Sequence, residues 1–134
     1  MSRDKLLDLL ADQQLPGVLC SSDGKGDVNA AVFGSVRLLD EQKIVVGLGD
    51  NRTLENLQKN PKATYVFYTP GQSILTWQGA RLYLKATRFD KSGQLFDQVI
   101  ADAEIAAGKM AASMLTTVVT FEIKEVRPLI DLAR

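Results

Sequence analysis

The sequence predicts a mainly β domain with peripheral helices, built on about six antiparallel strands that curl into a barrel. Three observations support this fold class. Short segments of alternating or β-branched residues recur along the chain, which is typical of strands. Most of these segments are joined by short turns, which favours antiparallel pairing. Closing such a sheet into a barrel removes the exposed edges of its outer strands.

The chain begins with a predicted helix and a predicted hairpin strand. Leucines alternate with charges over residues 3–13 in an amphipathic helical pattern, and Pro16-Gly17 ends it. Residues 18–22 predict a short strand. The turn sequence SDGKGD, residues 22–27, then closes a hairpin with the following strand.

Residues 28–39, VNAAVFGSVRLL, predict one half-buried strand because apolar residues alternate along it. Asp40-Glu41-Gln42 makes a tight connection into a second strand over residues 43–49. The apolar face of the first strand consists of even-numbered residues, namely Val28, Ala30, Val32, Val36 and Leu38.

A short helix over residues 53–60 is expected to stop before Pro61, since the residue preceding a proline disfavours helical geometry. Residues 63–68, ATYVFY, predict a β-branched and aromatic strand. Residues 74–89 predict one long strand in which Gly79 marks a bend or bulge.

The last elements are a second amphipathic helix over residues 92–107 and a strand over residues 115–126. The chain contains no internal repeat, no low-complexity tract and no linker. Residues 1–134 are therefore expected to form a single domain.

Composition limits the classes of function. Sixteen basic and sixteen acidic residues cancel, so no global field favours nucleic acid or an anionic membrane as a partner. No apolar run is long enough to span a membrane. Cys20 is the single cysteine, and with no export signal a cytoplasmic location is expected. The absence of histidine excludes Ser-His and Cys-His catalysis, and also zinc or haem bound through histidine.

The junction GLGDNRTLENLQKNP, residues 47–61, predicts a local anion site. A helix N-terminus offers unpaired backbone N–H groups and a partial positive charge. Asn51 or Thr53 can cap this helix. Arg52 adds a forked cation suited to phosphate, and the Thr53 hydroxyl adds a donor. The alternative is an ordinary capped helix with a solvated charge.

The strand before this junction predicts a platform for a flat ring. Gly47 and Gly49 share one face and carry no side chains. With a three-residue turn at 40–42, Ser35 and Phe33 would lie opposite them. A phosphate site beside a face of small residues suits a nucleotide-like cofactor, although glycines in strands also mark bulges.

The order of elements, together with VNAAVFGSVRLLDEQKIVVGLGDNRTLENLQKNPKATYVFY, resembles the FMN-binding split-barrel superfamily, which includes pyridoxamine 5′-phosphate oxidase-like proteins and small bacterial FMN-binding proteins. The similarity covers roughly residues 15–126. Its most specific part is a strand, the Arg-Thr pair, a short helix containing Asn56, and the NP stop before an aromatic strand.

The resemblance implies a split β-barrel that binds FMN non-covalently and forms a homodimer with the flavin at the interface. Arg52 and Thr53 would hold the phosphate, and Asn56 would lie near it. The Trp77 to Arg81 stretch would reach the flavin of the partner subunit. The residues that would run along the ring and ribityl chain are Asn29, Ala30 and Ala31 with Val46, Gly47, Leu48 and Gly49.

The implied function is that of a small flavoprotein, either an oxidoreductase or an electron carrier, in which the flavin supplies the reactivity. Vitamin B6 oxidases use histidine around the substrate, and this chain has none, which argues against that activity. The alternatives are a deazaflavin-binding barrel, a cofactor-free binding module for another phosphorylated ligand, and a structural protein. No residue is predicted to be catalytic, and the substrate or redox partner stays open.

Aromatic and sulfur side chains outside the junction are expected to be structural. Trp77, Tyr83 and Phe89 share a strand parity and are expected to pack against the 92–107 helix or a dimer partner. Cys20 is expected to be a small buried hydrophobe.

Overall fold

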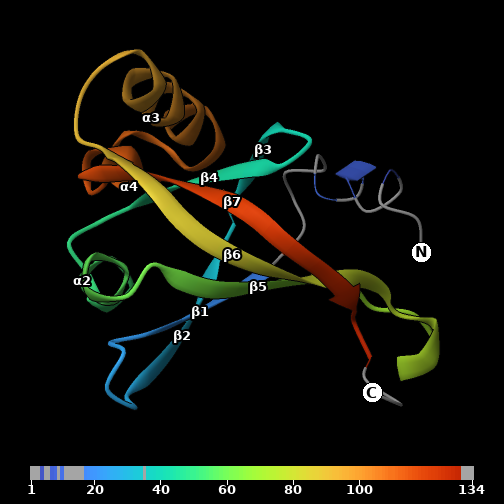
Figure 1. Ribbon diagram of the computed structural model, residues 1–134. Coiled ribbons are helices and arrows are strands. Elements are labelled where there is room, and N and C mark those ends of the chain that lie inside the picture. Colours follow the sequence, from blue (N-terminus) through green and yellow to red (C-terminus); the bar gives the residue numbers. More distant parts are fainter. Residues whose placement is uncertain (1–3, 5–6, 9, 11–16, 35, 131–134) are drawn as a thin grey trace.

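The computed structural model describes residues 4, 7–8, 10, 17–34 and 36–130. In this part of the chain, seven strands form one antiparallel sheet in the order β2-β1-β5-β6-β7-β4-β3 (Figure 1). The predicted mainly β fold with peripheral helices is confirmed. The strands are β1 (Gly17–Ser22), β2 (Val28–Phe33), β3 (Arg37–Asp40), β4 (Lys43–Leu48), β5 (Lys62–Thr69), β6 (Gln78–Asp90) and β7 (Thr117–Pro128).

The strand count exceeds the predicted six because the single strand expected over residues 28–39 is two strands. β2 forms the predicted hairpin with β1, whereas β3 pairs with β4. The hairpin turn is closed by the Asp23 carboxylate, which accepts the backbone N–H groups of Lys25 (2.7 Å) and Asp27 (3.2 Å). The hydrogen bond from Lys25 lowers the pKa of Asp23 below its ordinary value.

The apolar even-numbered face of β2 does not point into the protein, contrary to prediction. Val28 and Val32 are 80% and 71% exposed, and Ala30 between them is exposed as well. The odd-numbered residues of β2 point inward and are half-buried. After the break between β2 and β3, Val36 is buried again and Leu38 packs against the core.

The barrel interior is filled by alternate residues of most strands, as period-two alternation requires. Tyr65, which is 2% exposed, donates its hydroxyl to the Phe33 carbonyl oxygen (3.4 Å) and stacks on Phe67. Burial raises the pKa of Tyr65 to about 12. The largest fully buried side chains include Tyr65, Phe67, Phe121, Leu19, Ile44, Leu48 and Leu57.

β6 is the long strand predicted from residue 74, but it begins later, after the short 3-10 helix η1 (Ile74–Thr76). Gly79 pairs with Tyr68 in continuous register, so the bulge predicted at Gly79 is wrong. Glycine is required there because its φ is +153° and a Cβ would overlap the Phe67 carbonyl oxygen. The register shifts of β6 lie against β7, at Tyr83/Leu84 and Ala86/Arg88.

Three helices with defined bounds accompany the sheet: α2 (Arg52–Lys59), α3 (Gln94–Ala107) and α4 (Lys109–Ser113). α2 and α3 were predicted, and α4 was not. α3 and α4 lie together beyond β4 and β7, whereas α2 lies beside the start of β5 (Figure 1). The helix expected over residues 3–13 falls mostly outside the described residues.

A second, smaller apolar cluster lies under α3. Val99 of α3 packs there with Val45 of β4 and Val118 of β7. An ion pair between Arg37 of β3 and Asp102 of α3 adds a polar contact at this interface. The helix predicted over 92–107 thus covers the outer face of β4.

Candidate functional site

The N-terminus of α2 has the geometry of an anion site. Asn51 is the N-cap, and its side-chain oxygen accepts the Leu54 N–H (2.9 Å). The Asn51 carbonyl accepts the Glu55 N–H (3.1 Å). The amides of Arg52 and Thr53 lie in the first turn, where a helix supplies no acceptor. Two directed donors and the exposed Arg52 side chain therefore meet at this end of α2.

Local sequence explains where α2 begins and ends. Asn51 has extended backbone geometry and leads directly from β4 into the helix, as an N-cap does. Asn60 is the C-cap, and Pro61 follows it. α2 is anchored to the core by Leu54 and Leu57, which are 5% and 2% exposed. The predicted helix is confirmed, and Asn51 rather than Thr53 caps it.

A hydrogen bond joins this end of α2 to β2, which is distant in sequence. The Asn29 side-chain amide donates to the Thr53 hydroxyl oxygen (3.3 Å). Thr53 is 2% exposed, while Asn29 is half-buried and points to the inner side of the hairpin. Two of the residues that the resemblance implied for cofactor binding are thus in direct contact.

A second hydrogen bond ties α2 to β1. The Asn56 side-chain amide donates to the Ser21 hydroxyl oxygen (3.2 Å), and both residues are buried, at 6% and 5% exposed. Ser21 is also the strand partner of Asn29. Asn29, Ser21, Thr53 and Asn56 therefore form one polar cluster under the start of α2. Sequence reasoning missed Ser21, which no local pattern distinguishes from other serines.

Two open backbone edges flank the polar cluster. In the described part of the chain, β2 pairs only with β1. Among the described residues, β3 pairs with β4 only as far as Val45, and no strand pairs with Val46–Leu48 on the side away from β7. Open strand edges present N–H and C=O groups that a ligand can bond. α2 lies between the end of β4 and the β1–β2 hairpin (Figure 1).

The glycine face of β4 is not the open platform that the sequence suggested. A Cβ on Gly47 would lie 2.9 Å from a Leu115 methyl carbon and 3.3 Å from one of Val99, so that face is covered. A Cβ on Gly49 would lie 2.9 Å from the Met114 carbonyl oxygen. Arg37 lies opposite Val45, as the expected register between these strands requires. Phe33, however, belongs to β2 and pairs with β1, so it does not face these glycines.

The remaining residues implied for the cofactor differ in the direction in which their side chains point. Val46 and Leu48 are 1% and 0% exposed, with their side chains in the core, so only their backbone can meet a ligand. Ala31 is half-buried on the same side as Asn29. Ala30 is exposed on the opposite side. Thus the structure brings Asn29, Arg52, Thr53 and Asn56 together, and places Gly47 under the helices.

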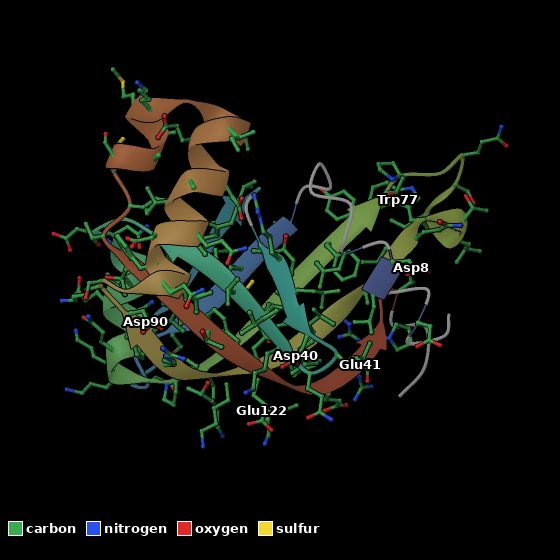
Figure 2. The ribbon with its side chains drawn as sticks, turned by 90° about the horizontal axis from the view of Figure 1, so that it is seen from above. Asp8, Asp40, Glu41, Trp77, Asp90 and Glu122 are labelled. Atoms are coloured by element: carbon green, nitrogen blue, oxygen red, sulfur yellow. The ribbon has the colours of Figure 1, made fainter. Side chains whose placement is uncertain are left out.

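Cys20 departs from its predicted surroundings, whereas packing of Trp77, Tyr83 and Phe89 against a dimer partner stays a prediction. Trp77 stacks on Tyr68 at 5.3 Å between ring centroids, and not on α3. Trp77 and Asp90 lie at opposite ends of β6 (Figure 2). Phe89 is 39% exposed. Cys20, expected to be buried, is half-buried on the outer face of β1.

No protein-family model matches the chain, and no curated protein matches its sequence. Solved structures do match. An FMN-binding protein from Syntrophomonas wolfei subsp. wolfei aligns with a TM-score of 0.79 at 20% identity, over 97% of this chain and 84% of that one. HutZ, the haem storage protein of Vibrio cholerae, aligns with a TM-score of 0.66 at 16% identity, over 96% of this chain and 91% of HutZ.

An FAD-binding protein from Mesorhizobium loti also aligns, with a TM-score of 0.66 at 12% identity, over 94% of this chain and 92% of that one. At such identities the comparisons establish the fold. The chain has the split-barrel fold of these proteins, which is the fold that the resemblance implied. Proteins named for binding FMN, FAD and haem share this fold.

Among the described residues, no helix has the length and apolar character needed to cross a membrane. The same residues contain no group of three or more acidic or cysteine side chains placed to hold a metal ion.

Proposed function

We propose that this protein is a small flavoprotein that binds FMN non-covalently, with the phosphate at the N-terminus of α2. The observation that carries the proposal is the Asn29–Thr53 hydrogen bond (3.3 Å). It holds β2 against the helix end, so that an open strand edge and a phosphate site lie side by side. The shared fold with an FMN-binding protein supports the same assignment.

The chain's residues fit the phosphate end of FMN well. The Arg52 and Thr53 backbone amides and the Arg52 guanidinium can donate hydrogen bonds to a phosphate. The N-cap is Asn51, so no acidic capping side chain takes up these donors. The open edge of β2 over Asn29–Ala31 offers backbone groups to the ring. The face of Gly47 does not fit the ring, because Leu115 and Val99 cover it. The ring is therefore assigned to the β2 side of the site.

Bound FMN would supply the redox chemistry, and the protein would supply anchoring and orientation. The fold is also shared with a haem storage protein, but this chain contains no histidine to ligate the iron. Whether the flavin serves an oxidoreductase or an electron carrier is decided by anaerobic mixing with a reduced nicotinamide. Reduction of the flavin at a catalytic rate supports an enzyme, and no reduction supports a carrier.

The binding test compares FMN with riboflavin, which lacks the phosphate. Purified protein should be yellow, and apoprotein should prefer FMN clearly. Arg52→Ala should weaken FMN binding by about 1–3 kcal/mol, the value of a charge-assisted contact, and leave riboflavin binding unchanged. Lys59→Ala, at the other end of the same helix, is the matched control. A colourless protein that ignores added FMN would refute the proposal.

A homodimer is part of the proposal. Val28 and Val32 are 80% and 71% exposed on the outer face of β2. Val18 of β1 lies opposite Val32 and continues the apolar strip toward Val66 of β5. Such a strip is costly in water and is typical of a subunit interface. Light scattering should give twice the chain mass, and Val32→Lys should give a monomer.

The second candidate function is a cofactor-free binding module for another phosphorylated ligand. The covered face of Gly47 favours it, because the phosphate end of the site is complete while one expected ring surface is absent. A colourless protein that ignores added FMN but binds inorganic phosphate would support this reading. Loss of phosphate binding in Arg52→Ala would place the ligand at α2.

A further inference from the structure

A hollow of about 610 Å³ lies over β1, β5 and β6 and extends to Val28 of β2 and to Asn60 at the end of α2. Cys20, Thr64 and Tyr83 lie in one row across β1, β5 and β6, since Cys20 pairs with Thr64 and Thr64 with Tyr83. They provide a floor of mixed apolar and hydroxyl character. Lys62 and Lys85 stand beside this row, two residues along their strands.

Lys62 and Lys85 are direct cross-strand partners between β5 and β6. Like charges at such positions repel each other and destabilise the pair. Both lysines are exposed, so water screens part of the repulsion. The described residues that line the hollow include no Asp or Glu to balance them.

A β-bulge adds a third lysine to the same rim. Tyr83 pairs with Glu125 and Leu84 with Ile123, so Lys124 is the extra residue of β7. A bulge re-aims the side chain of its extra residue, and Lys124 lines the hollow. The Lys124 ammonium donates to Glu122 (3.3 Å), which is also the strand partner of Lys85.

Two carboxylates of β7 lie beside this rim: Glu122, at the outer surface of the protein (Figure 2), and Glu125, the strand partner of Tyr83. Glu122 is paired with Lys124 (3.3 Å) and Glu125 with Arg127 (3.4 Å), so the rim keeps the positive charges of Lys62 and Lys85. The floor beneath it is formed by side chains of three adjacent strands, β1, β5 and β6. This combination differs from the α2 site, which is built from helix amides and an arginine.

We propose that this hollow binds a flat, largely apolar molecule that carries two anionic groups. Its body would lie on Cys20, Thr64 and Tyr83, and its anions would meet the rim lysines. Binding would relieve the repulsion between Lys62 and Lys85. The inference does not depend on FMN binding at α2, but it requires that the proposed dimer leave the hollow open, because Val28 of the proposed interface lies at its edge.

Cys20 allows a direct test, because it is the single cysteine and lines the hollow. Its labelling rate is measured with two aromatic disulfides, the dianionic dithiobis(nitrobenzoate) and the neutral dithiodipyridine. The neutral reagent reports the exposure and ionisation of the thiol. The ratio of the two rates therefore reports attraction of the anionic reagent to the hollow.

In the Lys62→Gln/Lys85→Gln variant, the anionic-to-neutral rate ratio should fall about tenfold, the size expected for losing two exposed charge contacts. The matched control is Lys91→Gln/Lys109→Gln, which removes two exposed lysines outside the hollow. A naphthalene disulfonate should slow labelling of the wild-type protein and the control, but not of the double variant.

Two results would overturn the inference. One is an unchanged rate ratio in the lysine variant. The other is a Cys20 that resists both reagents in the wild-type protein and reacts with both in the monomeric Val32→Lys variant. That pattern would mean that a second copy of the chain covers the hollow.

Discussion

The buried hydrogen bond between Asn56 and Ser21 (3.2 Å) predicts how firmly α2 is held in place. Replacing Ser21 by Ala removes the acceptor and leaves the Asn56 amide buried, with that residue only 6% exposed. An unsatisfied buried donor costs about 1–3 kcal/mol. We therefore expect the free energy of unfolding to fall by about 2 kcal/mol, and the melting temperature by about 8 °C.

The assay is a double-mutant cycle in urea with Ser21→Ala, Asn56→Ala and the double variant. Since each single change breaks the same contact, the double variant should cost less than the sum, with a coupling energy of about 1–2 kcal/mol. Ser113→Ala is the matched control. Ser113 is exposed and its hydroxyl bonds the Met110 carbonyl within α4, so its loss should cost about 0.5 kcal/mol or less.

The same variants test the link from folding to binding. Asn56 lies one turn beyond Arg52 on α2, so loosening its contact with β1 frees the helix end to shift. Affinity for FMN should fall in Ser21→Ala, while affinity for riboflavin should hold. A coupling energy near zero would refute the view that this bond positions α2. Equal losses for both flavins would show that the bond matters only for stability.

Two further predictions concern Tyr65, the largest buried side chain. Its pKa of about 12 lies above the ordinary value of about 10, so at alkaline pH the unfolded chain loses this proton first. Stability should fall by about 1.4 kcal/mol per pH unit between about pH 10 and 12, and Tyr65→Phe should remove that slope in urea titrations. A Cβ on Gly17 would overlap both the hydroxyl and the ring carbons of Tyr65, so Gly17→Ala should cost about 1–3 kcal/mol. Because phenylalanine keeps the ring carbons, Tyr65→Phe should recover only a small part of this loss, and full recovery would show that the hydroxyl alone clashes.

Local chemistry made α2 predictable from sequence. Its start follows from Asn51, whose side chain accepts the Leu54 N–H, and its end follows from Pro61. These signals involve residues within a few positions of each other. The phosphate end of the candidate site lies entirely within this segment. This part of the candidate site can therefore be predicted without knowledge of the fold.

Contacts between distant segments explain what the sequence did not reveal. Ser21 and Asn56 are 35 positions apart, and a serine in a short strand carries no sign of such a partner. Gly47 was expected to be open because its own strand is small on that face. Leu115 covers it from a segment that follows α4, and no pattern around Gly47 indicates this.

The sequence predicts the alternation of residues along β2 correctly. It does not predict which of the two faces points into the protein. Apolar residues were assigned to the core by default, since burial is the usual fate of a valine. β2 is an edge strand of the sheet, and its inner side is occupied by the Asn29 contact with Thr53. Hydrophobic pattern fixes the period of a strand, whereas its neighbours decide which face is inside.

The polar site and the exposed apolar strip depend on each other, because successive side chains of β2 point to opposite faces of the strand. Because Asn29 must face inward to bond Thr53, its neighbours Val28 and Ala30 must face outward, and Val32 follows them. A slip of one residue would bury the valines and lose the Asn29 contact together. A chain that keeps Asn29 at the start of α2 therefore also presents an apolar strand to a second copy, so the same register supports the proposed phosphate site and the proposed dimer.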